Sequence, residues 1–407
     1  MRIAFVHEFL LKGFASKDVV QVPSTLAQSL KCRWSYITRP PSDVSQIPEN
    51  GCVQFIGTQH SRTNLEHLRS GTESAVTYSK EFMLRAGWTA SADADVYIAM
   101  FLNVRTLLGV LAYRLGRFVR MKPGFVYLKV DLGFTGRKKM EERLKTSLIS
   151  RLMFSGIDWL FSCSADVISV ETEEGKQWIC NIYRRSAPKV IVVRNCSAAV
   201  SRGVVSEIRR ERRILAVSRL GAFEKAIDVL LPAFRIFSAS NPEWHLLLVG
   251  EANDRFSELI REYYDLVRTQ KIRHIGYVAD RLALTEIYRS AEIFVQPSRW
   301  ESFPTALIEA VKEGCIPICT PVFQVQEILG KYTDSLTAPV DDVKTLADIM
   351  CNQVAKMNEW SELRRYLEKR TEKWNWIDQL EPVAALIQKK MGASWRGPNI
   401  SGCNGSG

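Results

Sequence analysis

Residues Arg299–Thr320 read RWESFPTALIEAVKEGCIPICT and combine a loop, a helix and a buried strand. The helix is predicted because apolar or small residues recur at i, i+3, i+4 and i+7 from Leu307 to Gly314. Pro304 stands near the helix start, where a missing N–H costs little. The run Ile316–Cys319 then predicts a strand. This succession is typical of an alternating α/β sheet.

The same stretch places two carboxylates around the predicted helix start, Glu301 in the loop and Glu309 on the helix. A helix N-terminus offers N–H groups and a positive dipole end, so the backbone at Ser302, Phe303 and Thr305 can seat a phosphate-like anion. Acids above that seat could bind sugar hydroxyls. Glu309 lies roughly opposite the apolar stripe, a position equally typical of a solvated surface glutamate.

A second informative stretch, Ile214–Phe234, reads ILAVSRLGAFEKAIDVLLPAF and predicts strand, loop and helix. Arg219 and Lys225 flank its loop. Two cations across such a loop can converge on a diphosphate, the arginine as a fork and the lysine as a point charge. Two solvated basic residues are the alternative interpretation.

Strand-like runs alternate with helix-length segments along the whole chain, which predicts parallel α/β sheets. The charged stretch Glu207–Arg213 separates two such series, so we place a domain boundary at 208/209. We expect two doubly wound halves whose strands end at one shared cleft, where ligands of such sheets bind. The expected strands are Arg2–Val6, Val53–Ile56, Val96–Met100, Phe125–Val130, Val167–Val170, Val190–Val193, Ile214–Val217, His245–Val249, Ile272–Ile275, Ile293–Gln296 and Ile316–Cys319.

The ordered motifs resemble the nucleotide-sugar site of glycosyltransferase family 4, retaining enzymes of the GT-B fold. Arg219 and Lys225 match the R-x5-K pair of that family, and Glu301 and Glu309 match its E-x7-E motif. Between them, a strand ending at Gly250 and the sequence Ile275-Gly276-Tyr277 match two weaker elements. The resemblance covers about residues 210–320, and the ordered set is far more specific than a lone pair of spaced glutamates.

The resemblance implies roles for individual positions. Arg219 and Lys225 would hold the donor diphosphate, Glu301 would contact the transferred sugar, and Glu309 would bind the ribose. Backbone donors at the helix start would meet the sugar hydroxyls and the phosphate, and Arg273–Tyr277 would lie near the base. The implied donor-binding positions are Glu309, Ser302, Phe303, Pro304, Thr305, Gly250, His274, Ile275, Gly276 and Tyr277.

The first half departs from the family pattern in two places. Many relatives carry a glycine-rich loop after the first strand, whereas Phe9–Pro23 contains only Gly13, our candidate for backbone contact with the donor phosphate. Many also carry a histidine where this chain has Asp131, at the end of a predicted strand. Asp131 could contact the donor sugar or the acceptor hydroxyl, or it could simply begin a turn.

The resemblance also implies a domain plan and a reaction. Residues 1–208 would form an acceptor-binding Rossmann-like domain, and 209–370 the nucleotide-sugar-binding one. Residues 371–391 would form a helix that crosses back to the first domain, with an ordinary terminal packing helix as the alternative. Independently of the resemblance, the Gly-, Ser- and Asn-rich composition of 392–407 predicts a disordered tail. The activity implied is metal-independent transfer of a sugar from a nucleoside diphosphate to a glycan or lipid-linked glycan, with no cofactor, in cell-surface polysaccharide assembly.

Cysteine and hydropathy patterns favour a cytoplasmic protein. The nine cysteines form no C-x-x-C pair, which argues against metal and disulfide frameworks. The apolar start is interrupted by His7 and Glu8 and reads as a strand rather than a signal peptide. The run Phe101–Phe118 contains three arginines, so no transmembrane segment is expected.

The net charge of +11 is concentrated in residues 111–145, which contain ten Lys or Arg against three Asp or Glu. Such a surface suits the anionic inner face of a membrane and a lipid-linked acceptor, although it is also typical of a solvated basic face. No helix-turn-helix, zinc-finger or RNA-binding signature accompanies it, so nucleic acid is not an expected partner.

Two other functions stay open from the sequence. A catalytically silent GT-B subunit could bind nucleotide or glycan as a scaffold, an interpretation that the divergent first half favours. A sugar phosphorylase or a nucleotide-sugar epimerase of related fold is the second alternative. Release of UDP or GDP from nucleotide sugars would separate these functions, since a scaffold does not turn over, a phosphorylase requires phosphate and an epimerase needs no acceptor.

Overall fold

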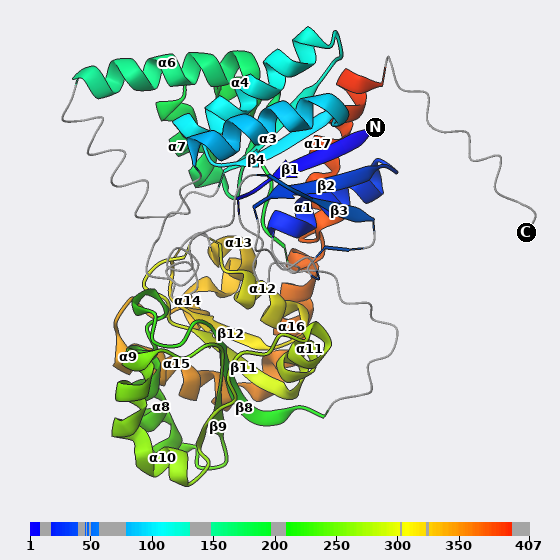
Figure 1. Cartoon of the computed structure of the whole chain (residues 1–407). Helices are drawn as coiled ribbons and strands as arrows, with labels where there is room; N and C mark the ends of the chain where they lie inside the picture. Colours follow the sequence, from blue (N-terminus) through cyan, green and yellow to red (C-terminus); the bar gives the residue numbers. More distant parts are fainter. Residues whose placement is uncertain are drawn as a thin grey trace, which may run out of the picture. The chain divides into compact units, whose positions relative to one another are not determined.

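A computed structural model describes residues 1–8, 18–39, 45, 47–48, 50–56, 79–130, 148–196, 209–301, 303–322 and 325–392 of the 407-residue chain. The chain forms two compact units (Figure 1). Unit 1 holds the described residues of Met1–Leu132, Lys139–Arg194 and Trp376–Gly407. Unit 2 holds those of Asn195–Asn375, so the chain leaves unit 1 and returns to it for its last helix.

Unit 1 contains a seven-stranded sheet with the order β3-β2-β1-β4-β5-β6-β7, in which every pair is parallel. Consecutive strands lead outward from β1 to β3, and then outward from β4 to β7. The strand order therefore reverses between β1 and β4, the switch point of a doubly wound sheet. The strands are β1 Arg2–Val6, β2 Arg33–Thr38, β3 Gly51–Phe55, β4 Val96–Met100, β5 Phe125–Val130, β6 Val167–Val170 and β7 Val190–Val192.

Helices connect these strands and pack against the sheet and against one another. The first helix, α1, packs against the chain's last helix, α17, and α4 packs against both α3 and α6 (Figure 1). Ser79, Asn103 and Thr172 cap α3, α4 and α7 by accepting hydrogen bonds from first-turn N–H groups. The helices are α1 Asp18–Ser29, α3 Lys80–Asp93, α4 Val104–Val119, α6 Leu148–Ser164, α7 Glu173–Ile182 and α17 Trp376–Met391, with a short 3₁₀ helix at Ala187–Lys189.

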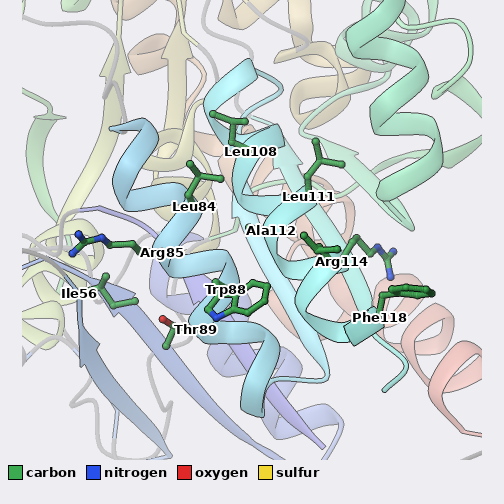
Figure 2. A pocket seen from close by; sticks show the side chains of 11 residues that line it. Ile56, Leu84, Arg85, Trp88, Thr89, Leu108, Leu111, Ala112, Arg114 and Phe118 are labelled. Carbon is green, nitrogen blue, oxygen red and sulfur yellow. The ribbon is translucent and has the colours of Figure 1, made fainter. Parts of the chain in front are cut away.

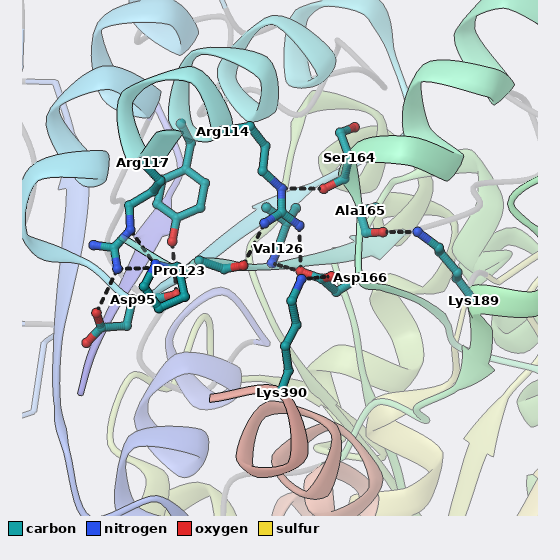
Figure 3. Close-up of polar contacts among 12 residues, drawn as sticks. Asp95, Arg114, Arg117, Pro123, Val126, Ser164, Ala165, Asp166, Lys189 and Lys390 are labelled. Carbon is teal, nitrogen blue, oxygen red and sulfur yellow. Dashed lines mark hydrogen bonds and ion pairs between the residues drawn. The ribbon is translucent and has the colours of Figure 1, made fainter. Parts of the chain in front are cut away.

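Polar contacts fix α4 and α17 to the strands of unit 1 (Figure 3). Arg114 of α4 donates to the carbonyls of Ser164 (2.8 Å) and Gly124 (2.6 Å) and forms an ion pair with Asp166 (2.6 Å). Lys390 of α17 pairs with the same Asp166. One partly buried carboxylate therefore connects the start of β6 with two helices that are far apart in the sequence.

Unit 2 contains a five-stranded, all-parallel sheet with the order β10-β9-β8-β11-β12. Its order reverses between β8 and β11, so the loops that follow these two strands border the switch point. Leu246, Leu248, Ile293 and Ile316 are fully buried or nearly so, as the apolar runs predict. The strands are β8 Glu211–Val217, β9 His245–Val249, β10 Ile272–His274, β11 Ala291–Gln296 and β12 Ile316–Cys319.

The helices of unit 2 connect these strands and pack on the sheet. Asn253, Asp280 and Asp342 cap α9, α11 and α15 through their side-chain oxygens. The elements are η5 Phe223–Lys225, α8 Ile227–Ser240, α9 Asp254–Leu259, η6 Ile260–Tyr263, α10 Tyr264–Arg268, α11 Arg281–Ser290, α12 Thr305–Lys312, α13 Val325–Leu329, η7 Gly330–Tyr332, α14 Thr333–Leu336, α15 Val343–Ala355, η8 Met357–Glu359 and α16 Trp360–Thr371.

The strand predictions are confirmed to within a few residues at their ends, and β2 is an additional strand. One detail of the predicted helix is wrong, because Gly314 ends α12 instead of continuing its buried stripe. Gly314 has φ +80°, its N–H donates to Val311, and the next N–H, of Cys315, donates to Ala310. This Schellman arrangement needs the left-handed backbone that glycine adopts readily.

The chain passes from one unit to the other at 194/195 and at 375/376, whereas the sequence-based boundaries are 208/209 and 370/371. The tail that we expected to be disordered lies, from Ala393 on, outside the described residues. Among the helices that the structure describes, none combines the length and the apolar composition needed to cross a bilayer.

Candidate functional site

The candidate site is centred on an ion pair between Lys225 and Glu301. The Lys225 Nζ lies 2.7 and 2.9 Å from the two carboxylate oxygens of Glu301. Lys225 ends η5, in the loop after β8, and Glu301 follows β11. The pair therefore joins the two loops at the topological switch point of the second sheet, the place where α/β sheets bind ligands.

Two neighbours hold Glu301 in a fixed orientation. Its Oε1 accepts hydrogen bonds from the amide of Gln296 (2.8 Å) and the hydroxyl of Ser298 (2.6 Å). The Glu301 side chain is only 9% exposed. Removing its cation would leave a nearly buried charge with polar neighbours alone, which is costly.

Arg299 clamps the Lys225 loop against the Glu301 loop. Its backbone N–H donates to the Glu224 carbonyl (2.8 Å) and its guanidinium to the Phe223 carbonyl (2.7 Å). The same guanidinium lies 4.1 Å from the centroid of the Phe223 ring and forms two hydrogen bonds with Asp228, at 3.1 and 2.8 Å. Burial by itself would raise the pKa of Asp228, but the hydrogen bonds and the charge of Arg299 have the larger opposite effect. The pKa of Asp228 is therefore below its ordinary value, and the carboxylate is ionised.

The backbone bends sharply behind Lys225. Ala226 is fully buried and has φ +51°, a left-handed conformation that costs a residue with a Cβ about 1 kcal/mol or more. It connects η5 to the first turn of α8. The turn fixes the direction from which the Lys225 side chain approaches Glu301.

Arg219 belongs to the same loop but is much less constrained. Its guanidinium pairs with Glu224, and its side chain is 59% exposed. Such a surface pair contributes less than about 1 kcal/mol, so an anionic ligand could displace Glu224. Of the two cations in this loop, Lys225 is therefore held in place and Arg219 is free to reorient.

Glu309 is bound by two residues of α11. The Arg281 guanidinium lies 2.6 Å from one carboxylate oxygen, and the Tyr288 hydroxyl donates to the other at 3.1 Å. Burial and the Glu309 charge raise the pKa of Tyr288 well above its usual value, so the phenol remains a donor. Glu309 is 11% exposed, so the fully solvated alternative does not describe it.

The N-cap residue of α12, the helix that carries Glu309, forms no side-chain hydrogen bond with the first-turn N–H groups. Pro304 is the N-cap of α12 and has no side-chain group with which to accept from the first-turn N–H groups. Thr305 begins the helix, and the Phe303 ring lies 6.0 Å from the Trp374 ring. Ser302 lies outside the described residues.

The remaining candidates of unit 2 line the same sheet edge. Gly250 has φ +143°, and its N–H donates to the Gly276 carbonyl (2.8 Å) while its carbonyl is bonded to the His274 ring (3.0 Å). Ile275 and Tyr277 are 41% and 57% exposed. Because parallel strands end at one edge, the structure gathers these residues with Arg219 and Lys225 at that edge.

In unit 1, the corresponding strand ends are internally paired. Glu8, after β1, accepts from the Ser79 N–H (2.6 Å) and pairs with Arg39 (3.3 Å). Lys129, in β5, pairs with Asp18 (2.7 Å) and Glu171 (3.1 Å). Gly13 and Asp131, the candidates named from the sequence, lie outside the described residues.

Sequence reasoning missed Arg299, Arg281 and Tyr288, which hold the candidate acids and their loops. A signal existed for the last two, because a separation of seven residues places them on one face of a helix. No group of three His, Cys, Asp or Glu side chains suited to a metal ion occurs within the described ranges. Metal independence stays a prediction.

Residues 211–356 match the family of glycosyl transferases group 1. Mannosylfructose-phosphate synthase of Agrobacterium fabrum is 35% identical over 114 residues, which cover 26% of this chain and 25% of that relative. The chain thus spans about a quarter of the length of this curated relative, and the next two are matched over 21% and 36% of theirs.

Two solved structures resemble almost the whole chain. The lipopolysaccharide outer core galactosyltransferase WaaB, in its apo form, has 16% identity and a TM-score of 0.61, over 96% of this chain and 100% of that one. Anabaena HepE in complex with UDP has 13% identity and a TM-score of 0.65, with the same coverage. At such identities the likeness shows the fold, so the chain has a two-sheet GT-B fold, within which residues 211–356 match the family of glycosyl transferases group 1.

Proposed function

We propose that the protein is a retaining glycosyltransferase that moves a sugar from a nucleoside diphosphate sugar to a glycan or lipid-linked glycan. The observation that supports this most is the Lys225–Glu301 ion pair at the switch point, beside the exposed Arg219. A diphosphate needs cations, and a sugar needs carboxylate acceptors for its hydroxyls. This edge of unit 2 offers both.

In this mechanism the protein acts by positioning and electrostatics. Arg219 would exchange Glu224 for the diphosphate, and Lys225 would face the leaving phosphate while Glu301 holds the sugar. The departing phosphate would take the proton of the acceptor hydroxyl as the new glycosidic bond forms on the same face of the sugar. Fixed cations stabilise the charge that develops on the leaving group, which is usually the largest catalytic effect.

Glu309 would bind the ribose hydroxyls. Arg281 and Tyr288 hold its carboxylate at 2.6 and 3.1 Å, so its orientation is set before the donor arrives. A carboxylate that is already oriented loses little conformational entropy when it accepts hydrogen bonds from the ligand. The exposed Ile275 and Tyr277, along the same sheet edge, would lie near the base.

We further propose that the protein works in the cytoplasm at the inner face of an anionic membrane, where lipid-linked acceptors are presented. The basic stretch 111–145 supports this, although residues 131–145 lie outside the described ranges. Polysaccharide assembly is the process that such an acceptor suits. No cofactor or metal ion is part of this mechanism.

The first experiment is a thermal-shift panel with UDP, GDP, ADP and CDP. A ligand that binds only the folded protein raises its apparent stability by mass action. UDP is the first choice because Anabaena HepE was solved with it. A shift with one diphosphate, followed by its release from a nucleotide sugar in the presence of EDTA, supports a metal-independent transferase. Binding without turnover would indicate a scaffold, and a phosphate requirement a phosphorylase.

Lys225→Ala is expected to lower turnover by about a hundredfold or more, because it removes a cation aimed at the leaving group. Steady-state release of nucleoside diphosphate measures this, with the exposed Lys356→Ala as the control. Since Lys225→Ala also deprives Glu301 of its partner, the unfolding temperature is recorded alongside. Arg219→Ala removes the second cation proposed to contact the diphosphate. Because the Arg219 side chain is 59% exposed, this change leaves no buried charge unpaired. Full activity in both variants would refute the proposed role.

A further inference from the structure

Helices α3 and α4 of unit 1 display a second apolar face that points away from the core. On α4, Leu108, Leu115 and Phe118 lie on this second face, and the half-buried Leu111, which also packs against the core, lies at its border. Leu107 and Val110 occupy the buried face. On α3, Leu84 and Trp88 are 43% and 44% exposed and lie one turn apart. The core of the unit therefore leaves large apolar side chains of both helices in contact with solvent, among them Leu84, Trp88 and Phe118.

These side chains line an open groove of about 940 Å³ between the two helices (Figure 2). Figure 2 shows Leu84 and Trp88 on one side of it and Leu108, Leu111 and Phe118 on the other. Phe118 is 80% exposed. A monomeric protein that leaves such a patch in water normally uses it for contact with another molecule or a membrane.

The groove continues into an apolar tip at the end of α4. Val119 is 62% exposed and Met121 is 93% exposed. Met121 also has φ +52°, so a residue with a Cβ occupies a left-handed turn that glycine would adopt at lower cost. We call Phe118, Val119 and Met121 the α4 tip.

The charged residues of α4 and of the turn that follows it are all basic. Residues 104–124 contain five Lys or Arg and no Asp or Glu. Arg114 and Arg117 point inward to carbonyl groups, Asp166 and Asp95 (Figure 3). Lys122 is exposed at the tip, and Arg120 lies 4.9 Å from the Trp88 ring centroid.

This combination selects among possible occupants. Apolar side chains enter the acyl region of a bilayer, tryptophan suits its interface, and exposed cations meet anionic headgroups. A symmetric dimer through this face would bring identical cations together.

We propose that the α3–α4 groove and the α4 tip form a docking surface for an anionic lipid bilayer. The tip side chains enter the headgroup boundary, the groove accepts acyl chains between Trp88 and Phe118, and Lys122 with Arg120 contacts lipid phosphates. This surface refines the membrane contact proposed above, but its test needs neither donor nor acceptor, so it can fail or succeed independently of sugar transfer.

The test is cosedimentation of the full chain with vesicles of phosphatidylcholine alone and of phosphatidylcholine mixed with phosphatidylglycerol. The wild type is expected to bind only the anionic vesicles. Phe118→Ser combined with Met121→Ser should weaken binding at least about 10-fold by removing buried apolar area. Lys122→Glu should weaken it by about 10-fold through charge. Matched controls are Ile236→Ser, 50% exposed on α8 of unit 2, and Lys356→Glu.

Three outcomes would overturn the proposal. The wild type could fail to bind anionic vesicles, or the tip variants could bind as well as the controls. The third is a concentration-dependent dimer, detected by light scattering and abolished by the tip variants, in a protein that leaves vesicles unbound. That result would assign the surface to a second copy of the chain. Because the substituted side chains are exposed, unchanged unfolding temperatures are expected and confirm that the variants are folded.

Discussion

Gly250 shows how a single residue fixes the edge of the candidate site. Its φ is +143°, and a Cβ built there would lie 1.7 Å from the Ser218 carbonyl oxygen. The backbones after β8 and β9 therefore approach as closely as they do only because position 250 has no side chain.

Gly250→Ala is expected to destabilise unit 2 by on the order of 3 kcal/mol, through steric contact added to backbone strain. Urea unfolding monitored by circular dichroism measures the change. Gly276→Ala is the matched control, because Gly276 has φ +74° but no atom within 4 Å of the position that a Cβ would take, leaving about 1 kcal/mol of strain. Equal losses in the two variants would contradict the steric explanation.

At the residue scale, the sequence predicted Lys225, Glu301 and Glu309 as site residues but not the side chains that hold them. Their spacing carried the signal, because it matches a known motif. Arg299 forms contacts with Phe223, Glu224 and Asp228, about seventy residues away in the chain. Contacts of that separation depend on the folded sheet and leave no local pattern.

At the element scale, Lys129 connects three segments of unit 1. Its ammonium is 1% exposed and lies between Asp18, at the start of α1, and Glu171, after β6. Burial alone would lower the pKa of Lys129, but the two carboxylates raise it above its ordinary value. The lysine is therefore charged and its contribution to stability is present below about pH 10.5, then lost as the pH rises further.

Lys129→Met is expected to cost about 3–5 kcal/mol at neutral pH, because it removes a buried ammonium that forms ion pairs with Asp18 and Glu171. Urea unfolding again provides the measurement, with the exposed Lys389→Met of α17 as the control. A loss no larger than that of the control would show that the ion cluster is not stabilising.

Elements were predictable from sequence where apolar residues were continuous. The runs at Val96–Met100 and Val167–Val170 are buried throughout and match their strands residue for residue. Strand β2 reads RWSYIT, with a charged first residue and Ser35 in its interior, so its apolar signal is interrupted. The end of α12 was misplaced because a small residue such as Gly314 fits both a helical stripe and a C-terminal cap.

At the scale of the whole molecule, we expect buried thiols to make the folded protein less stable as the pH becomes alkaline. All eight described cysteines are free. Burial raises the pKa of Cys315 and Cys319 from 9.0 to about 12. The unfolded chain therefore loses these protons at a lower pH than the folded protein, so stability is fully present below pH 9.0 and falls as the pH rises toward 12.

The unfolding temperature is therefore expected to decline steadily above about pH 9. Combining Cys315→Ala with Cys319→Ala should flatten this slope, even though the smaller side chains lower stability at neutral pH. Cys52→Ala, at an exposed position, should leave the slope unchanged. If the slope persists in the double variant, other groups govern the alkaline transition.

The overall architecture was predictable because the spacing of apolar residues indicates where strands and helices alternate along the chain. Both parallel sheets were expected, and the structural likeness to GT-B proteins confirms the fold. The points at which the chain passes between units were not located as well, because the charged stretch Glu207–Arg213 is partly in β8. Charge alone does not distinguish a linker from an exposed strand end.

The return of the chain to unit 1 has a consequence for biosynthesis. Helix α17 buries Trp376, Leu380 and Ile387 and packs on α1, which emerges from the ribosome more than three hundred residues earlier. Unit 2 is uninterrupted between these two moments of translation, so it can finish folding while the older half still waits for its final helix. In a nascent chain stalled before Trp376, unit 2 would be complete, whereas α1 of unit 1 would lack the helix that packs on it. Such exposed apolar surface is what chaperones bind.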